Sequence, residues 1–230
     1  MNFIYGILLS GGSGTRFASN SPKQFTDLCG KPILVHAALA FKKWGLLKTL
    51  VVVAHPDHLL QTEEILADCL DGSDKIVAGG KTRHESTLNG IAATNAGSND
   101  VLVFHDGARP FVTSTEFDLV VHAAIRSGAA STAAKATDTL VVASKRETCE
   151  SFLQRDSVRL IKTPQALHTS VLTELKDKML EEEPTDLCSW VQVIDLQAEL
   201  VSANPYNLKV TVAEDLKIAT SYYSYFQEDN

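Results

Sequence analysis

Short apolar runs alternate with helix-patterned segments along much of the chain, and this alternation limits the possible folds more than any other feature. Four stretches have the length and composition of buried strands: FIYGILL (3–9), LKTLVVVAH (47–55), KIVAGG (75–80) and VLVFH (101–105). Strands that alternate with helices indicate an α/β fold with a mainly parallel sheet. Ligands of such sheets bind beyond the carboxyl ends of the strands, so the loops at 10–24, 79–83 and 105–111 are expected to share one edge.

The segments between these runs carry apolar residues at helical spacing. The expected helices cover residues 33–44, 56–70, 83–96 and 114–127. Asp57 is expected to cap the second of them, and a final helix is expected to begin near Thr211 after a last strand.

Composition places the chain among soluble globular proteins. Of its 230 residues 44% are hydrophobic and 21% charged, and the net charge of −7 argues against general nucleic-acid binding. No stretch approaches the roughly 18 apolar residues of a membrane span, and the apolar run at 3–9 suits a first strand better than a signal peptide. The four cysteines show no paired spacing, so we expect reduced thiols in a cytoplasmic protein.

The middle of the chain has a different character from the rest. Residues 131–165 are rich in Thr and Ser, with short β-prone pieces and no long helical pattern. An irregular excursion or a small arm from the main sheet, at about 134–160, would explain this composition. No linker rich in Pro, Gly or Ser separates two domains, so a single domain with this arm is expected.

The loop after the first strand, SGGSGTRF (10–17), combines glycines with positive charge. Gly11, Gly12 and Gly14 allow close backbone approach, and exposed N–H groups of such loops bind anions. A glycine-rich turn alone is equally suited to a tight connection. Arg16 and Lys23 in the same loop favour phosphate binding.

The strand at 101–105 runs into the turn HDGARP. Asp106 stands where the strand should end, a position suited to holding Mg²⁺. Alternatively, Asp106 caps the turn and pairs with Arg109, and an arginine can also hold a metal-binding carboxylate in place. His105 is expected to be a packed, hydrogen-bonded residue and not a ligand.

A second glycine pair precedes a helix in GGKTRHES (79–86). Arg83 and Ser86 stand at the start of that helix, where backbone groups could contact a base edge or a ribose. By itself the motif is weak evidence for such contacts, because a glycine pair before a helix is common.

Taken in order, several motifs together resemble one enzyme family. They are LLSGGSGTRF, SPKQF, GGKTRHES, HDGARPFV, TDT, RLIKTPQ, TDL and NLKVTVAEDL. Residues 3–222 resemble the cytidylyltransferases that make CDP-activated polyol phosphates from D-ribitol 5-phosphate or 2-C-methyl-D-erythritol 4-phosphate. The resemblance implies a Rossmann-like nucleotidyltransferase fold, three-layered with a mainly parallel sheet and a small β-rich dimerisation arm. It also implies CTP, Mg²⁺ and a homodimer whose arms reach toward the partner's site.

The same resemblance assigns roles residue by residue. It implies a nucleotide site of Ser10, Gly11, Gly12, Gly80, Arg83 and Ser86. It implies catalytic roles for Arg16, Lys23 and Lys209, with Asp106 at the metal. Thr139 and Arg155 match the arm positions that bind the acceptor, and Lys209 completes that site.

The acceptor is expected to be ribitol 5-phosphate, with 2-C-methyl-D-erythritol 4-phosphate as the alternative. The methylerythritol enzymes usually carry a basic residue before the Asp-Thr of the arm, whereas Thr137 stands there in this chain. Tyr206 departs from the small or acidic residue expected at its position. A non-catalytic nucleotide-binding module and a sugar-phosphate enzyme that uses UTP or GTP are further alternatives.

Overall fold

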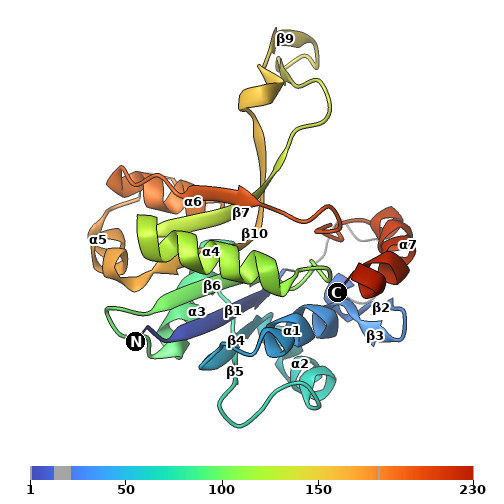
Figure 1. The fold of residues 1–230 in the computed structure, drawn as a ribbon, viewed down its shortest axis with the longest axis vertical. Helices are drawn as coiled ribbons and strands as arrows, with labels where there is room; N and C mark the ends of the chain where they lie inside the picture. Colours follow the sequence, from blue (N-terminus) through green and yellow to red (C-terminus); the bar gives the residue numbers. More distant parts are fainter. Residues whose placement is uncertain (1, 13–21, 181, 230) are drawn as a thin grey trace.

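A seven-stranded sheet forms the centre of the computed structural model, which describes residues 2–12, 22–180 and 182–229 (Figure 1). Its strands, in spatial order, are β11 (Glu199–Ser202), β7 (Ala129–Lys135), β10 (Arg159–His168), β6 (Val101–Asp106), β1 (Ile4–Ser10), β4 (Thr49–Ala54) and β5 (Lys75–Ala78). Strand β10 runs antiparallel to both of its neighbours, and the other pairs are parallel. The predicted mainly parallel sheet is confirmed.

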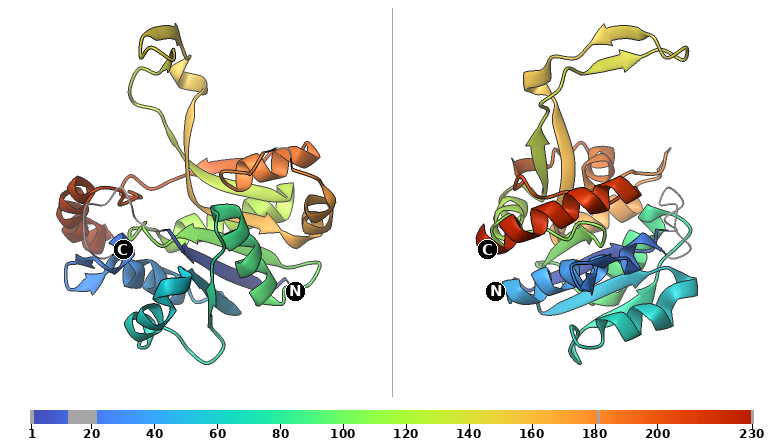
Figure 2. Two further views of the ribbon diagram at one scale, coloured as in Figure 1. Left: turned by 180° about the vertical axis from the view of Figure 1, so that it is seen from behind. Right: turned by 90° about the vertical axis from the view of Figure 1, so that its right-hand side faces the viewer.

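Helices cover both faces of this sheet, which makes three layers (Figures 1 and 2). The helices are α1 (Ile33–Trp44), α2 (Leu59–Leu66), α3 (Arg83–Thr94), α4 (Ser114–Ser127), α5 (Leu172–Asp177), α6 (Leu187–Val191) and α7 (Ala213–Asp229). Alternate residues of the strands face opposite sides: Leu50 and Val52 pack with α1 and α4, whereas Val51 and Val53 pack with α3 and α6. Both faces of the central strands are therefore buried, which explains their continuous apolar sequences.

The helix boundaries follow local capping chemistry. The Thr113 side chain accepts from the Glu116 N–H, and α4 ends at Gly128 with φ 88°, so the expected helix at 114–127 is confirmed. The prediction that Asp57 caps the second helix is wrong. Pro56–His58 form a 3-10 turn in which the His55 side chain accepts from the Asp57 N–H.

The chain's last helix packs beside a small hairpin. Strands β2 (Asp27–Leu28) and β3 (Lys31–Pro32) form this hairpin. Leu28 of the hairpin and Ala219 of α7 are buried in the same apolar cluster. Helix α7 begins two residues after the predicted start, because the Asp215 carboxylate accepts from the N–H groups of Thr211 and Val212.

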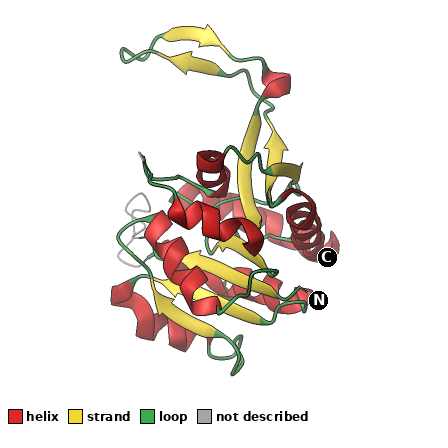
Figure 3. Cartoon of the chain, turned by 90° about the vertical axis from the view of Figure 1, so that its left-hand side faces the viewer, coloured by secondary structure: helices red, strands yellow, loops and turns green. Residues whose placement is uncertain are grey.

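A slender arm projects from the body in every view (Figures 1 to 3). Strands β7 and β10 pair at its root, and β8 (Val141–Ala143) pairs with β9 (Cys149–Phe152) at its far end. The arm and its root expose large apolar side chains: Val141, Val142, Phe152, Leu153, Leu160 and Ile161. Exposed apolar side chains gathered in this way mark an interaction surface.

Composition predicts reduced cysteines and no membrane span. None of the four cysteines forms a disulfide. Within the described part of the chain, no helix has both the length and the apolar character needed to cross a bilayer.

Candidate active site

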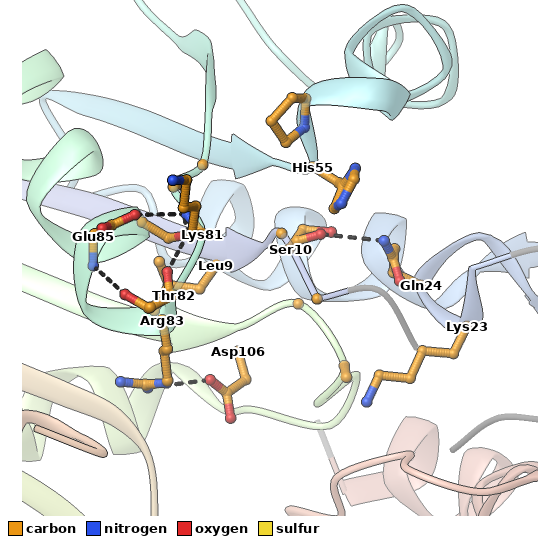
Figure 4. Close-up of a pocket in the computed structure, with 18 of the residues that line it drawn as sticks. Leu9, Ser10, Lys23, Gln24, His55, Lys81, Thr82, Arg83, Glu85 and Asp106 are labelled. Carbon is orange, nitrogen blue, oxygen red and sulfur yellow. Dashed lines mark hydrogen bonds and ion pairs between the residues drawn. The ribbon is translucent and has the colours of Figure 1, made fainter. Parts of the chain in front are cut away.

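A cavity of about 700 Å³ lies at the carboxyl ends of β1, β4, β5 and β6 (Figure 4). Residues of all three predicted loops line it: Ser10, Gly11, Gly12, Lys23 and Gln24; Gly79, Gly80, Lys81, Thr82 and Arg83; and Asp106, Gly107 and Ala108. Lys209 and Thr211 contribute from the segment before α7. The loops therefore meet at one edge of the sheet, as the parallel topology predicts.

Bare backbone forms one wall of the cavity. Among the described residues, a Cβ added at Gly12 would meet no atom within 4 Å, and one at Gly11 would make only ordinary contacts. Gln24 braces this wall by donating from Nε2 to the Ser10 carbonyl oxygen at 3.2 Å. The buried Ser10 hydroxyl has no hydrogen-bond partner within residues 2–12, 22–180 and 182–229, so among these residues nothing competes with a ligand for it. Lys23 extends toward the cavity (Figure 4), while Arg16 lies outside the described residues.

The second glycine pair requires glycine for steric reasons. A Cβ at Gly80 would overlap the Glu85 side chain at the first turn of α3. The Gly80 N–H donates to the Ser86 hydroxyl at 3.1 Å, and that hydroxyl donates to the Thr82 carbonyl oxygen at 2.8 Å. These bonds hold the loop against the helix and bring Arg83 to the cavity wall.

The Asp106 carboxylate lies among three positively charged side chains at the cavity floor. It lies 2.8 Å from Lys209 Nζ, 3.3 Å from the Arg83 guanidinium and 3.5 Å from Arg109 Nε. Burial by itself would raise the pKa of Asp106, but Lys209, Arg83 and Arg109 outweigh burial and hold this pKa below its ordinary value. Asp106 therefore stays ionised, and the predicted pairing with Arg109 is confirmed.

His105 is fully buried behind this carboxylate. The Asp106 N–H donates to the Thr163 hydroxyl at 3.1 Å, and this hydroxyl donates to His105 Nδ1 at 3.0 Å. His105 Nε2 lies 3.0 Å from the Arg109 carbonyl oxygen, an acceptor, so Nε2 carries the ring proton. Burial lowers the pKa of His105 to about 4. His105 is thus the packed, hydrogen-bonded residue that the sequence predicted, and it shapes the turn that carries Asp106.

The free energy of unfolding is expected to fall as the pH drops from about 6.5 toward 4, and His105→Gln should flatten this fall. The unfolded chain protonates His105 near its ordinary pKa of 6.5, whereas the folded protein keeps it neutral down to about 4. The unfolded state then binds more protons, so stability is lost with acid at up to about 1.4 kcal/mol per pH unit. Urea unfolding at several pH values measures both slopes. Equal slopes would contradict the assignment, since His36 and His84, also lowered in pKa by burial, remain in both proteins.

The two arm residues lie apart from the cavity of their own chain. Thr139 and Arg155 are exposed on the arm, and Arg155 donates to the Thr137 carbonyl oxygen at 3.3 Å. Neither lines the cavity.

Several buried or half-buried polar residues behind the site were not predicted from the sequence. They are Glu116, Lys162, Asn204 and Asn207, joined to one another or to Arg109 by hydrogen bonds. One signal was present, because Thr-x-x-Glu at 113–116 is a capping-box pattern. That pattern predicts the start of a helix but gives no indication of contacts with residues about 90 positions away.

The cavity floor fits a single-carboxylate Mg²⁺ site. Mg²⁺ is commonly bound by one or two carboxylates together with substrate phosphates, and the ionised Asp106 offers a carboxylate of this kind. Among the described residues no group of three or more His, Cys, Asp or Glu side chains is placed to hold a metal without a substrate.

Comparison with known proteins identifies the family. The family described as IspD, 2-C-methyl-D-erythritol 4-phosphate cytidylyltransferase, matches residues 4–224. The chain belongs to the 2-C-methyl-D-erythritol 4-phosphate cytidylyltransferase family. It is therefore a nucleotidyltransferase, and the predicted family and enzyme class are confirmed.

Individual members of this cytidylyltransferase family match over nearly their whole length. The protein of that name from Leptospira borgpetersenii is 39% identical over 225 residues, covering 98% of this chain and 95% of the relative. The one from Syntrophus aciditrophicus is 34% identical, with 95% of each chain covered. The crystal structure of 4-diphosphocytidyl-2C-methyl-D-erythritol synthase from Anaerococcus prevotii matches with TM-score 0.84 and 26% identity, covering 97% of this chain and 96% of that one. These matches confirm the Rossmann-like nucleotidyltransferase fold.

The comparisons do not support the expected preference for ribitol 5-phosphate; they favour the alternative acceptor, 2-C-methyl-D-erythritol 4-phosphate. Thr137, one of the features on which the preference rested, is exposed on the arm and does not line the cavity of its own chain. Tyr206, the other departure, has its ring against Tyr222 and Phe226 of α7, with centroids 5.5 and 6.2 Å apart. Its aromatic character is explained by this packing.

Proposed function

We propose that this cytidylyltransferase transfers CMP from CTP to 2-C-methyl-D-erythritol 4-phosphate and releases pyrophosphate. The observation that carries the proposal is a glycine-walled cavity whose floor holds Asp106 among three cationic side chains. The acceptor is taken from the names of the relatives, which match over nearly the full chain.

The nucleotide lies against the two glycine loops in this proposal. The bare backbone of Gly11 and Gly12 leaves room for it, and the Ser10 hydroxyl and the Gly80 loop supply polar groups at the same wall. Arg83 and Ser86, at the start of α3, line the part of the cavity that holds the nucleotide. Glycine is needed at these positions because a side chain would fill the space or displace α3.

Nucleotidyl transfer takes place at the charged floor of the cavity. An oxygen of the acceptor's phosphate attacks the α-phosphorus of CTP in line, the bond from that phosphorus to the bridging oxygen breaks, and pyrophosphate leaves. Lys23, Lys209 and Arg16 stabilise the negative charge that develops on the phosphates, so the chemistry needs positioning and charge and not a covalent nucleophile. Mg²⁺, held by Asp106 and the phosphates, would add positive charge at the reacting group.

A homodimer completes the acceptor site in this proposal. The arm projects from the body (Figure 2), exposes apolar side chains and carries Thr139 and Arg155, neither of which lines the cavity of its own chain. Two such chains related by a two-fold axis can each place an arm at the other's cavity.

Pyrophosphate release measures the proposed reaction directly. CTP, UTP, GTP and ATP are each supplied with 2-C-methyl-D-erythritol 4-phosphate and, in parallel, with ribitol 5-phosphate. Turnover is expected with CTP and the methylerythritol phosphate. Faster turnover with ribitol phosphate would correct the acceptor, and tight CTP binding without turnover would favour a binding module.

Asp106→Asn is expected to preserve the fold and to lower turnover at saturating Mg²⁺ by at least about tenfold, because it removes the negative charge that faces the ion. The matched control is Asp57→Asn, since Asp57 is an exposed carboxylate at the cavity rim. Steady-state rates across a magnesium titration measure the effect. Full activity of Asp106→Asn at every magnesium concentration would leave Asp106 with only a turn-stabilising role.

A further inference from the structure

Glu116 is a buried carboxylate that the reaction outlined above does not use. It lies at the first turn of α4, with 2% of its surface exposed. Its Oε2 accepts from the Thr113 N–H at 3.0 Å, which is the bond expected of a helix cap. A cap could be made at the surface, so capping does not explain why this charge is buried.

Glu116 Oε2 also accepts from the Thr113 hydroxyl at 3.2 Å, and the other bonds of the carboxylate go to the segment that carries Lys209. Its Oε1 accepts from the Asn204 N–H at 3.1 Å and from Asn207 Nδ2 at 2.8 Å, and Oε2 also accepts from Asn204 Nδ2. These partners lie about 90 residues away in the sequence. Both Asn204 and Asn207 precede Lys209 by only a few residues.

Glu116 bonds to the middle of a segment whose ends are fixed by backbone bonds. The Ala203 N–H donates to the Ala133 carbonyl oxygen at 3.0 Å, and the Val210 N–H donates to the Ala108 carbonyl oxygen at 2.9 Å. Between these two points Asn207 is fully buried, and its Nδ2 also donates to the Thr163 carbonyl oxygen at 2.8 Å.

The same segment gathers two more cations near the site. Arg109 and Lys162 both donate to the Asn207 carbonyl oxygen, at 3.3 and 2.6 Å. Burial lowers the pKa of each, and the Glu116 charge opposes that effect in both. The negative charge of Glu116 thus compensates positive charges that would otherwise repel each other around Asn207.

We propose that Glu116 is a positioning residue for phosphoryl transfer: through Asn204 and Asn207 it sets the place of Lys209 against Asp106. Its kinetic consequence rests on the proposed function. Glu116 lies behind the site and acts on the position of the Lys209 ammonium group. Such alignment matters because a displacement of about 1 Å can lower a rate about 10²-fold.

Glu116→Gln tests this role with almost no change in size. Its amide nitrogen would face donors on one side, either the Asn204 N–H and Asn207 Nδ2 or the Thr113 N–H and Asn204 Nδ2, so one of these two sets of bonds is lost. We expect kcat to fall about 10- to 100-fold while KM for CTP stays within about twofold, since the glycine loops are untouched. Hydrogen exchange of the backbone amides at 203–211 should become faster.

Thr113→Ala is the matched control on the same helix. It removes the hydroxyl that accepts from the Glu116 N–H and donates to Glu116 Oε2 at 3.2 Å, and it keeps the bonds that Glu116 accepts from Asn204 and Asn207. It should lower the melting temperature while leaving kcat within about twofold. Asn207→Ala, which removes the partner, should lower kcat like Glu116→Gln, and the double variant should lose less than the sum of both effects. This second variant keeps the test valid if Glu116→Gln does not fold.

The outcomes separate this inference from the proposed function. If wild-type protein turns over CTP and 2-C-methyl-D-erythritol 4-phosphate, equal kcat values for Glu116→Gln and Thr113→Ala overturn the positioning role. If wild-type protein shows no turnover, the proposed function fails and hydrogen exchange decides the inference. Faster exchange at 203–211 in Glu116→Gln but not in Thr113→Ala supports the positioning role, and equal exchange in the two variants overturns it.

Discussion

Lys209→Met is expected to lower kcat/KM by about 10²- to 10³-fold, because one preorganised charge at a reacting phosphate contributes that much to the transition state. Lys209 Nζ lies 2.8 Å from the Asp106 carboxylate at the cavity floor, where the phosphates of the nucleotide are proposed to lie. Methionine keeps the length of the side chain and removes its charge. Pyrophosphate release with CTP and the proposed acceptor measures the loss.

Lys48→Met is the control for this experiment. Lys48 is exposed at the start of β4, at the edge of the sheet opposite the cavity, with its ammonium group 3.9 Å from the centre of the Phe3 ring. This variant should keep wild-type kinetics. If Lys209→Met were as active as Lys48→Met, Lys209 would serve only to pair with Asp106, and the phosphate role would be wrong.

Two inactive variants are expected to recover activity when they share a dimer. Lys209→Met disables the cavity of its own chain, and Arg155→Ala disables the arm that its chain lends to the partner. In a mixed dimer one site combines an intact cavity with an intact arm, so up to about half of the wild-type activity per dimer should return. The exposed apolar side chains of the arm and its distance from its own cavity are the structural basis for this expectation.

Differently tagged copies allow the mixed dimers to be isolated and assayed. A mixture of Lys209→Met with Lys23→Ala is the control: both changes damage the cavity of the chain that carries them, so no intact site forms. Isolated Lys209→Met/Arg155→Ala dimers that stay inactive would show that the arm does not complete the partner's site.

Most of the fold and one wall of the site could be predicted from the sequence. Continuous apolar strands separated by helical patterns require a parallel sheet buried on both faces, and in such a sheet the loops at 10–24, 79–83 and 105–111 must meet. The position of His105 in a buried strand likewise indicated a packed side chain. The error at Asp57 was local, because the preceding His55 supplies the capping group that the pattern assigned to Asp57.

The sequence by itself thus determined which kinds of residue lie along one edge of the sheet: glycines that allow close approach, cationic side chains in the loops, and a carboxylate at the end of β6. Only the tertiary structure decided which distant groups meet there. Lys209 and Asp106 are 103 residues apart, and Glu116 reaches Asn204 and Asn207 across about 90 positions. No local pattern carries these pairings, because capping and periodicity act over a few residues. The pairings arise when the segment after β11 folds back over the end of the sheet and buried charges and amides must find partners.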